Sequence, residues 1–371
     1  MRVTNKMMTN NMMRWVAKQS EKLNDAETVV ASGKQVNKPS DNPQAASQIL
    51  LDRANISLYG QYKSNIDLAK TWIETDENTL DAVDTFLEEV QGILSQQSSE
   101  ELTKDSAIEQ LQSIYDQVLD LANTRYGSDY MYSGNQVNTT PFANEVEISG
   151  GSPSDIIFGL AADASDLTVE ITDSAGEVVR TLDVTGGGTE GVNTIAWDGL
   201  DNGGSTLTDG EYAFSIVASN TEGDAVTGYP IYRGDDGSKQ VMIGEDSVVM
   251  IDRNGEEIFS ETLCDLSRMI TALQSSDYDP DLISDLNSSM NTAIEQMAAE
   301  RVALSNIYSQ METVDVRLDQ VILTVNDRLT DVETGSDDEA VIKLQSQQTA
   351  YEVTLEAAAT MLNMRKLSDY L

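Results

Sequence analysis

A long apolar stripe in the C-terminal third of the chain constrains the fold more than any other feature. Between residues 294 and 332, apolar side chains recur in alternating steps of three and four. All of its positions except Arg301 and Asp315 are apolar or tyrosine: Ile294, Met297, Arg301, Leu304, Tyr308, Met311, Asp315, Leu318, Ile322, Val325, Leu329 and Val332. Because the pattern persists over almost six heptads, it predicts a coiled-coil seam rather than a helix of a globular domain.

The N-terminal third contains two stripes with the same spacing. The first consists of Ile66, Ala69, Ile73, Asp76, Leu80, Val83, Leu87, Val90 and Leu94, and the second of Leu111, Ile114, Val118 and Leu121. A helix cannot bury a narrow apolar stripe by itself. We therefore expect these helices to pack on one another as a long, antiparallel, rod-like bundle.

Both ends of the chain carry weaker stripes of this kind. One includes Gln19 and precedes Gly33, a residue type that often ends a helix, and the other includes Val341 and Gln348. Two marginal helices outside a domain are poorly ordered unless they dock, so we expect an assembly interface between subunits. Its predicted residues are Val16, Leu23, Ala26, Val30, Leu344, Tyr351, Leu355, Ala358 and Leu362. The alternative is that both helices complete an intramolecular bundle.

The middle of the chain has a different composition, rich in Gly, Thr and alternating β-branched residues. Four segments, 167–172, 177–184, 192–197 and 211–219, alternate apolar and polar residues between turn signals. Short strands at this spacing predict a small antiparallel sandwich. Residues 146–228 contain 15 acidic residues against Arg180 alone, so we expect this sandwich to face water.

These patterns predict a mainly α-helical coiled-coil rod, made of N- and C-terminal arms, with an inserted all-β sandwich. The predicted segments are 1–42 (N-terminal assembly helix), 43–145 (N-terminal part of the rod), 146–228 (sandwich), 229–265 (β-rich return), 266–339 (C-terminal part of the rod) and 340–371 (C-terminal assembly helix). At the end of the first segment, Pro39, Ser40 and Asp41 provide turn chemistry. Asn42 is then a predicted N-cap and Pro43 the first helical residue.

Charge and composition argue against several classes of function. With 23 basic and 63 acidic residues, the formal net charge is −40, which repels nucleic-acid phosphates and anionic membranes. The chain has no histidine and one cysteine, Cys264, so imidazole chemistry, a thiolate cage and an intrachain disulfide are absent. We expect no enzyme, no catalytic residue, no metal, no cofactor, no nucleic acid and no membrane insertion. A carboxylate-dependent hydrolase with an acidic site in the insert is the remaining enzymatic alternative.

Two loops of the insert resemble ligand-binding loops only superficially. The glycines at 186–188 lack the Lys-Ser/Thr ending that holds phosphates, and they indicate a hairpin loop. Residues 198–209 have the length of a calcium loop with Gly203 at its sixth position. Leu200 at the third position cannot coordinate a cation, so we do not expect an EF-hand.

The N-terminal segment does not resemble a cleavable signal peptide. Its apolar residues, among them Met12, Met13 and Trp15, are interrupted by Asn and Arg residues, whereas a signal peptide needs an unbroken apolar core of about 7–15 residues. If the protein is extracellular, we expect it to leave the cell by another route.

Several segments resemble the flagellin family of bacterial axial proteins, and within it the hook–filament junction type. The segments are Met1-Arg2-Val3-Thr4, the stretch 33–47 with Pro39-Ser40-Asp41-Asn42-Pro43, the stretch 121–142 with Tyr130-Met131-Tyr132-Ser133-Gly134, Asn254-Gly255-Glu256-Glu257-Ile258-Phe259, and Leu367-Ser368-Asp369-Tyr370-Leu371. Their order and spacing span residues 1–145 and 229–371. Residues 167–219, with Trp197-Asp198-Gly199 and Asp209-Gly210-Glu211-Tyr212, are instead similar to the immunoglobulin-like domain of the flagellar hook-capping protein.

The resemblance implies a non-enzymatic structural adaptor of the bacterial flagellum, exported unfolded through the flagellar secretion channel. It implies a homo-oligomeric ring that joins the first hook-associated protein, on the hook side, to flagellin. It also implies terminal helices that fold as they assemble, and an export chaperone that shields the C-terminal segment beforehand. A filament-forming flagellin and a hook-cap-like assembly scaffold are the two alternatives within this class.

Overall fold

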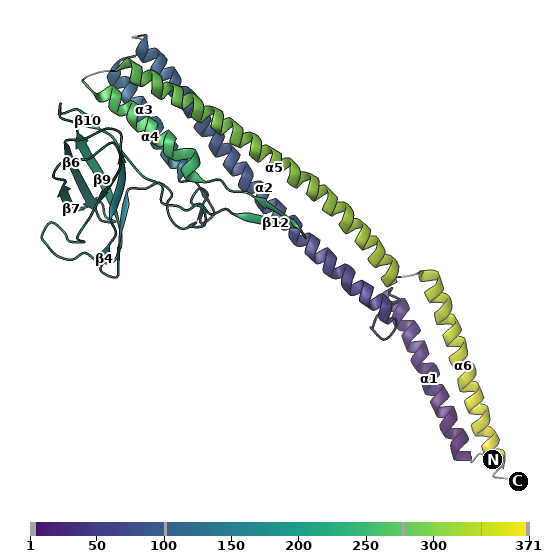
Figure 1. Cartoon of the computed structure of the whole chain (residues 1–371). Coiled ribbons are helices and arrows are strands. Elements are labelled where there is room, and N and C mark those ends of the chain that lie inside the picture. Colours follow the sequence, from purple (N-terminus) through teal and green to yellow (C-terminus); the bar gives the residue numbers. More distant parts are fainter. Residues whose placement is uncertain (1–4, 100–101, 277–278, 335, 369–371) are drawn as a thin grey trace. The chain divides into compact units, whose positions relative to one another are not determined.

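Most residues in this computed structural model of the chain lie in helices (Figure 1). The structure describes every residue except 1–4, 100–101, 277–278, 335 and 369–371. The helices are α1 (Asn5–Ser32), α2 (Pro43–Ser98), α3 (Lys104–Ala122), the π-helix η1 (Glu256–Ser260), α4 (Glu261–Gln274), α5 (Pro280–Thr334) and α6 (Asp337–Ser368).

The strands lie between α3 and η1. They are β1 (Arg125–Tyr126), β2 (Asp129–Tyr130), β3 (Glu145–Ser149), β4 (Ser152–Pro153), β5 (Ile156–Leu160), β6 (Asp166–Thr172), β7 (Val178–Asp183), β8 (Gly191–Ile195), β9 (Gly210–Ser219), β10 (Ala225–Val226), β11 (Gly228–Tyr229), β12 (Gln240–Gly244) and β13 (Ser247–Met250). The predicted helical arms with an inserted β region are therefore confirmed.

The chain forms two compact units, which share α2 and α5. Unit 1 contains residues 1–64 and 314–371, and unit 2 contains residues 65–313. The charge is divided very unequally between them. Unit 1 has 14 basic and 16 acidic residues, a net charge of −2, whereas unit 2 has 9 basic and 47 acidic residues, a net charge of −38.

In unit 2, the predicted stripes form the helical core. Every residue of the predicted stripe on α2, from Ile66 to Leu94, is at most 5% exposed. On α5, buried residues recur every seven positions at Met290, Met297, Leu304 and Met311. A hydrogen bond from Gln91 Nε2 to Asn291 Oδ1 of 2.8 Å, and one from Tyr308 Oη to Glu74 of 3.0 Å, show that the two helices run antiparallel.

In unit 1, ion pairs connect the remaining parts of α2 and α5. Asp52 is fully buried and binds the guanidinium of Arg328 through both carboxylate oxygens. Lys63 lies between Asp315, at 3.0 Å, and Asp319. The polar interruption of the stripe at Asp315 is thus an ion-pair position.

The insert consists of two antiparallel sheets around one apolar core. One sheet has the order β4-β3-β9-β6-β7 with β10 on β9, and the other has the order β11-β5-β8. Phe158 of one sheet packs near Phe214 of the other, with ring centroids 6.3 Å apart, and Trp197 joins the same core. The four strands predicted from sequence are confirmed in β6, β7, β8 and β9.

Sequence reasoning missed β3 and β5. In β5, Ile156, Phe158, Gly159 and Leu160 are all buried and only Ile157 is exposed, so this strand lacks the alternation on which the prediction depended. Within the described residues, no helix is long and apolar enough to cross a bilayer.

Candidate assembly surface and motif segments

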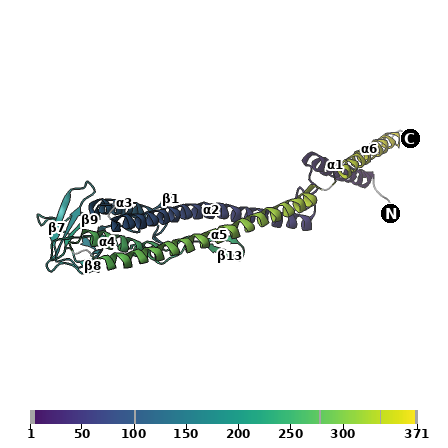
Figure 2. The ribbon, with the colours of Figure 1, turned by 90° about the horizontal axis from the view of Figure 1, so that it is seen from above.

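Helices α1 and α6 lie side by side in unit 1 (Figures 1 and 2). Among the predicted assembly residues, only Ala26 is buried by this pairing, at 4% exposed. Val30 and Leu355 remain 38% and 42% exposed. The half-buried residues are Val16, Leu23, Leu344, Tyr351 and Ala358, and the side chain of Leu362 lies outside the described part of the chain.

The contact between α1 and α6 is partly polar. Gln19 Nε2 donates a hydrogen bond of 3.1 Å to Gln347 Oε1 in the middle of the pair. A seam with one buried alanine and a glutamine pair removes little apolar surface from water, so the pairing gives only a small part of the stabilisation available to these stripes. The pairing leaves them incompletely covered.

A second apolar face on α6 was not recognised in the sequence. Ile342, Val353 and Met361 are 67%, 59% and 46% exposed. At about 100° per residue, Ile342 and Val353 share one side of the helix, opposite Leu344 and Tyr351, and Met361 lies between the two sides. The spacing of eleven residues between Ile342 and Val353 is the signal that could have identified this face. The N-terminal helix contributes further exposed apolar side chains, namely Met7, Met8, Met13 and Trp15.

The motif loop between α1 and α2 is held by its own side chains. The Asp41 carboxylate accepts hydrogen bonds from the backbone N–H groups of Asn37, at 3.1 Å, and Lys38, at 2.8 Å. Asn42 Oδ1 accepts from the N–H of Ala45 at 3.1 Å, directly before Pro43 begins α2. The predicted N-cap is confirmed. Pro39, Ser40, Asp41, Asn42 and Pro43 are all exposed.

A second helix signal near this loop is also confirmed. Gly33 follows the last residue of α1 and has a φ of +68°, the left-handed conformation that glycine adopts without strain. Next to the loop lies an open groove of about 430 Å³, lined by residues of α1, the loop and α6, among them Lys22, Lys38 and Lys343.

The motif segments 121–142 and 254–259 meet inside unit 2, whereas Met1-Arg2-Val3-Thr4 and residues 369–371 of the last motif lie outside the described part of the chain. The side chain of Asn123 bonds the backbone of Phe142 in both directions, donating to its O at 2.8 Å and accepting from its N–H at 3.0 Å. The ring of Phe259 packs on Tyr132, with centroids 4.9 Å apart, and on Phe142, at 6.2 Å. Segments that are far apart in the sequence therefore form one aromatic cluster. The role of these motif residues is to hold the fold together.

A buried acid adjoins this cluster. Tyr132 Oη donates a hydrogen bond of 2.7 Å to Asp76 Oδ1, and both residues are at most 1% exposed. Burial raises the pKa of Asp76 to about 6 against the lowering effects of the Tyr132 hydrogen bond and the Arg253 charge. Burial also raises the pKa of Tyr132, so its hydroxyl keeps its proton.

The carboxylates of the candidate calcium loop accept hydrogen bonds from backbone N–H groups. Asp201 Oδ1 accepts hydrogen bonds from the N–H groups of Gly203 and Ser205, each at 2.8 Å. Asp209 accepts from the N–H groups of Gly150 and Gly151. These geometries are those of turns. Within the described residues, no group of three or more His, Cys, Asp or Glu side chains could hold a metal ion.

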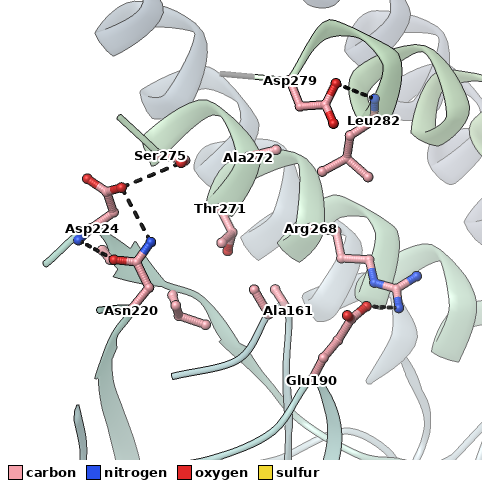
Figure 3. A pocket seen from close by; sticks show the side chains of 13 residues that line it. Ala161, Glu190, Asn220, Asp224, Arg268, Thr271, Ala272, Ser275, Asp279 and Leu282 are labelled. Carbon is pink, nitrogen blue, oxygen red and sulfur yellow. Dashed lines mark hydrogen bonds and ion pairs between the residues drawn. The ribbon is translucent and has the colours of Figure 1, made fainter. Parts of the chain in front are cut away.

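The insert docks on α4 around a cleft of about 300 Å³ (Figure 3). Arg268 of α4 forms an ion pair with Glu190 of the insert at one side of the cleft. At the other side, Asp224 accepts hydrogen bonds from the N–H of Ser276, at 2.9 Å, and from its hydroxyl, at 2.8 Å. These bonds to Ser276 are the main reason that the pKa of Asp224 is lowered.

The single cysteine, Cys264, donates a hydrogen bond of 3.3 Å to Tyr229 Oη. Burial raises the pKa of the Cys264 thiol.

In comparisons with known proteins, the N-terminal arm and the insert match two different protein families. Residues 3–137 match the bacterial flagellin N-terminal helical region, and residues 143–222 match the FlgD Ig-like domain. Flagellar hook-associated protein 3 of Escherichia coli K12 is 30% identical over 149 residues, which cover 39% of this chain and 47% of that protein. Basal-body rod modification protein FlgD of Salmonella typhimurium is 37% identical over 101 residues, which cover 27% of this chain and 41% of that protein.

The chain therefore matches less than half the length of each of these relatives. A solved structure described as a flagellar hook-associated protein from Vibrio parahaemolyticus is 14% identical, with a TM-score of 0.51, and covers 79% of this chain and 100% of that one. This likeness shows a shared fold. Together, the matches confirm the predicted resemblance to flagellar hook-associated proteins and, for the insert, to FlgD.

Proposed function

We propose that this chain is a non-enzymatic structural component of the bacterial flagellum that connects the hook side to the flagellin filament. The observation that carries the proposal is the incomplete cover of the apolar stripes on α1 and α6, in a chain whose residues 3–137 match the flagellin N-terminal region. Contiguous apolar faces on a protein surface mark interaction sites.

The proposed mechanism is coupled ordering and association. Copies of the chain form a ring in which neighbouring α1 and α6 helices cover the stripes that one copy leaves open. Burying a fully exposed large apolar side chain contributes about 1.5–3 kcal/mol. The half-buried stripe residues gain a part of this each, and their sum offsets the entropy lost when the terminal helices become fixed. The assembly residues are those of the predicted stripe, from Val16 to Val30 and from Leu344 to Leu362.

The proposed neighbours of the ring are the first hook-associated protein on the hook side and flagellin on the filament side. The chain would reach them by export without a cleavable signal peptide, with a chaperone covering the C-terminal segment before export. In this proposal the helical arms form a coiled-coil rod, and residues 146–228 form an immunoglobulin-like sandwich that takes no part in the inner contacts.

A second candidate function, a hook-cap-like assembly scaffold, is favoured by one observation. The insert matches the FlgD Ig-like domain over residues 143–222. Residues 3–137 match the bacterial flagellin N-terminal helical region instead, and the helical arms hold the incompletely covered apolar faces, so the junction role explains more of the chain. Immunolocalisation separates the two: a junction protein stays at the hook–filament boundary of mature flagella, whereas a cap is present only while the hook grows.

The main experiment is electron microscopy of flagella from a strain that lacks this chain. The proposal predicts hooks without filaments and flagellin shed into the medium, both restored by the wild-type chain. Leu355→Asp should not restore filaments, because it places a charge in a seam that becomes dry on assembly. Gln345→Asp, on an exposed polar position of the same helix, is the matched control and should restore them. Normal filaments in the deletion strain would refute the proposal.

A further inference from the structure

Within unit 1, helix α2 and the loop that follows α1 both bond to one residue, Glu333. This residue is the last but one of α5. Its carboxylate accepts from Arg53 Nη2 of α2, at 2.8 Å, and from Lys34 Nζ of the motif loop. Its backbone oxygen accepts from the N–H of Gln35 at 2.7 Å. The Glu333 side chain is only 12% exposed, so these three donors surround it.

Groups from other parts of the chain supply the hydrogen-bond donor and the positive charges that the C-terminus of α5 lacks. The last carbonyl groups of a helix have no partner within the helix, and its C-terminus favours nearby cations. The last turn of α5, residues 331–334, contains no Lys or Arg. Gln35 supplies the missing donor, and Lys34 and Arg53 supply the missing cations. The neighbouring positive charges lower the pKa of Glu333, with the Lys34 hydrogen bond as the largest cause.

The position of Glu333 relates it to both terminal helices. Lys34 and Gln35 follow directly on Gly33, where α1 ends, and α6 begins at Asp337, four residues after Glu333. The contact between α1 and α6 further along is weak, since it buries one predicted seam residue and contains a glutamine pair. The firm attachment between the two terminal helices is therefore at their base.

We infer that Glu333 is a latch that fixes where α1 and α6 start, so that both helices are anchored at their base when neighbouring copies order and cover the rest of their stripes. The inference rests on the proposed function, because it makes the latch a condition for ordered assembly. It assigns a role to the motif loop, whose internal bonds through Asp41 present Lys34 and Gln35 to the end of α5. Glu333 acts as a positioning residue and contacts no partner itself.

The test is hydrogen exchange on the full-length monomer, compared between wild type, Glu333→Gln and Asp331→Asn. Asp331 is an exposed acid two residues earlier on the same helix, so its variant is the matched control for loss of one charge. We expect amide exchange in α1 and α6 to accelerate on the order of tenfold in Glu333→Gln, the effect of removing two partly exposed ion pairs. Exchange in residues 65–98 should not change, and Asp331→Asn should behave as wild type.

A second variant distinguishes a latch from a general loss of stability. Lys34→Gln should accelerate exchange in both terminal helices, and the double variant Lys34→Gln/Glu333→Gln should add little to Glu333→Gln alone, because both changes break the same interaction. Fully additive effects, or unchanged exchange in either terminal helix of Glu333→Gln, would overturn the latch.

Failure of the latch and failure of the proposed function give different results. If Glu333→Gln exchanges as wild type while Leu355→Asp still abolishes filaments, the latch is wrong and the junction role stands. If Glu333→Gln loosens both helices but the deletion strain grows normal filaments, the latch stands as a structural device and the junction role is wrong. If Glu333→Gln loosens both helices and filaments form at the wild-type rate, the latch is not a condition for assembly.

Discussion

Asp76 and Tyr132 form a hydrogen-bonded pair of 2.7 Å inside the helical core of unit 2, where both side chains are excluded from water. Asp76 occupies a stripe position of α2 that would otherwise be apolar, and Tyr132 belongs to one of the motif segments. The second oxygen of Asp76, Oδ2, accepts no hydrogen bond from any residue that the structure describes. The charges of Asp252 and Glu300 further raise the pKa of Asp76, and that of Arg253 lowers it.

This pair predicts a pH dependence of stability. The pKa of Asp76 is raised from 3.8 to about 6 in the folded chain, so the folded state binds the proton more tightly than the unfolded state. The resulting stabilisation is complete below the unfolded pKa and is lost as the pH rises through about 6. A shift of this size corresponds to about 3 kcal/mol.

Asp76→Asn isolates this effect from the many other acids of the chain. The amide imitates the protonated carboxyl and still accepts from Tyr132. The free energy of unfolding of Asp76→Asn should match wild type near pH 4 and exceed it by about 2–3 kcal/mol near pH 8. Urea unfolding at a series of pH values measures the difference. A constant difference across that range would show that Asp76 is not the titrating group.

A glycine of the motif stretch 254–259 gives a second prediction. A Cβ placed on Gly255 would lie 2.5 Å from the backbone oxygen of Tyr132, so Gly255→Ala must displace this segment from the aromatic cluster. We expect a loss of about 1–3 kcal/mol in the free energy of unfolding, measured by urea denaturation.

Gly92 is the matched control for that substitution. It lies within α2, and a Cβ there would meet no atom of the described chain within 4 Å. Gly92→Ala should therefore stabilise the protein, by about 0.5–1 kcal/mol, because alanine loses less backbone entropy in a helix. Equal effects of the two substitutions would contradict the close approach at Gly255.

The insert should be removable without loss of the helices. The chain enters and leaves it side by side: Phe142 and Tyr232 are antiparallel bridge partners, and Arg233 Nη1 lies 2.6 Å from Glu145 Oε2. A two-residue Asn-Gly turn can join such neighbours. Replacing residues 146–228 by Asn-Gly should keep the helical circular dichroism and a cooperative melt. Loss of the helical signal would mean that the insert is part of the helical core.

Much of the fold follows from periodicity. The stripe from Ile66 to Leu94 and the seven-residue repeat of Met297, Leu304 and Met311 are buried as predicted, because long amphipathic helices have few other ways to remove these side chains from water. Strand β5 was missed because four of its five residues are buried, so the strand shows no alternation of apolar and polar residues. The units and their charge difference were also missed, because the boundary between the units falls inside the continuous helices α2 and α5, where the sequence pattern does not change.

Sequence reasoning identified the candidate site only in part. The spacing of Leu344, Tyr351 and Leu355 is enough to place them on one helix face. Their exposure depends on how closely α1 approaches, which periodicity does not encode. Glu333 gives no sequence signal at all, since it is one acid among 63, and its role arises only where Lys34 and Arg53 converge on it.

The division of charge predicts that salt controls self-association. Copies that associate through unit 1, with a net charge of −2, bring together units 2 that each carry −38. Helices α2 and α5 cross the unit boundary near the first and last residues of unit 2, so acids such as Asp67 and Glu312 lie within three residues of unit 1 in the sequence. Like charges on neighbouring copies repel one another unless ions screen them. The screening length is about 10 Å at 0.1 M salt and about 3 Å at 1 M.

We therefore expect the full-length chain to associate at least about tenfold more tightly in 1 M than in 0.1 M sodium chloride, as measured by sedimentation equilibrium, with potassium chloride equivalent. Salt also strengthens apolar contacts, and the variant lacking residues 146–228 separates the two causes. It keeps the whole of unit 1 but loses 15 acidic residues against one basic residue, so its association should be tighter at 0.1 M and depend less on salt. Equal salt dependence in the two proteins would assign the effect to apolar contacts and contradict repulsion between units 2.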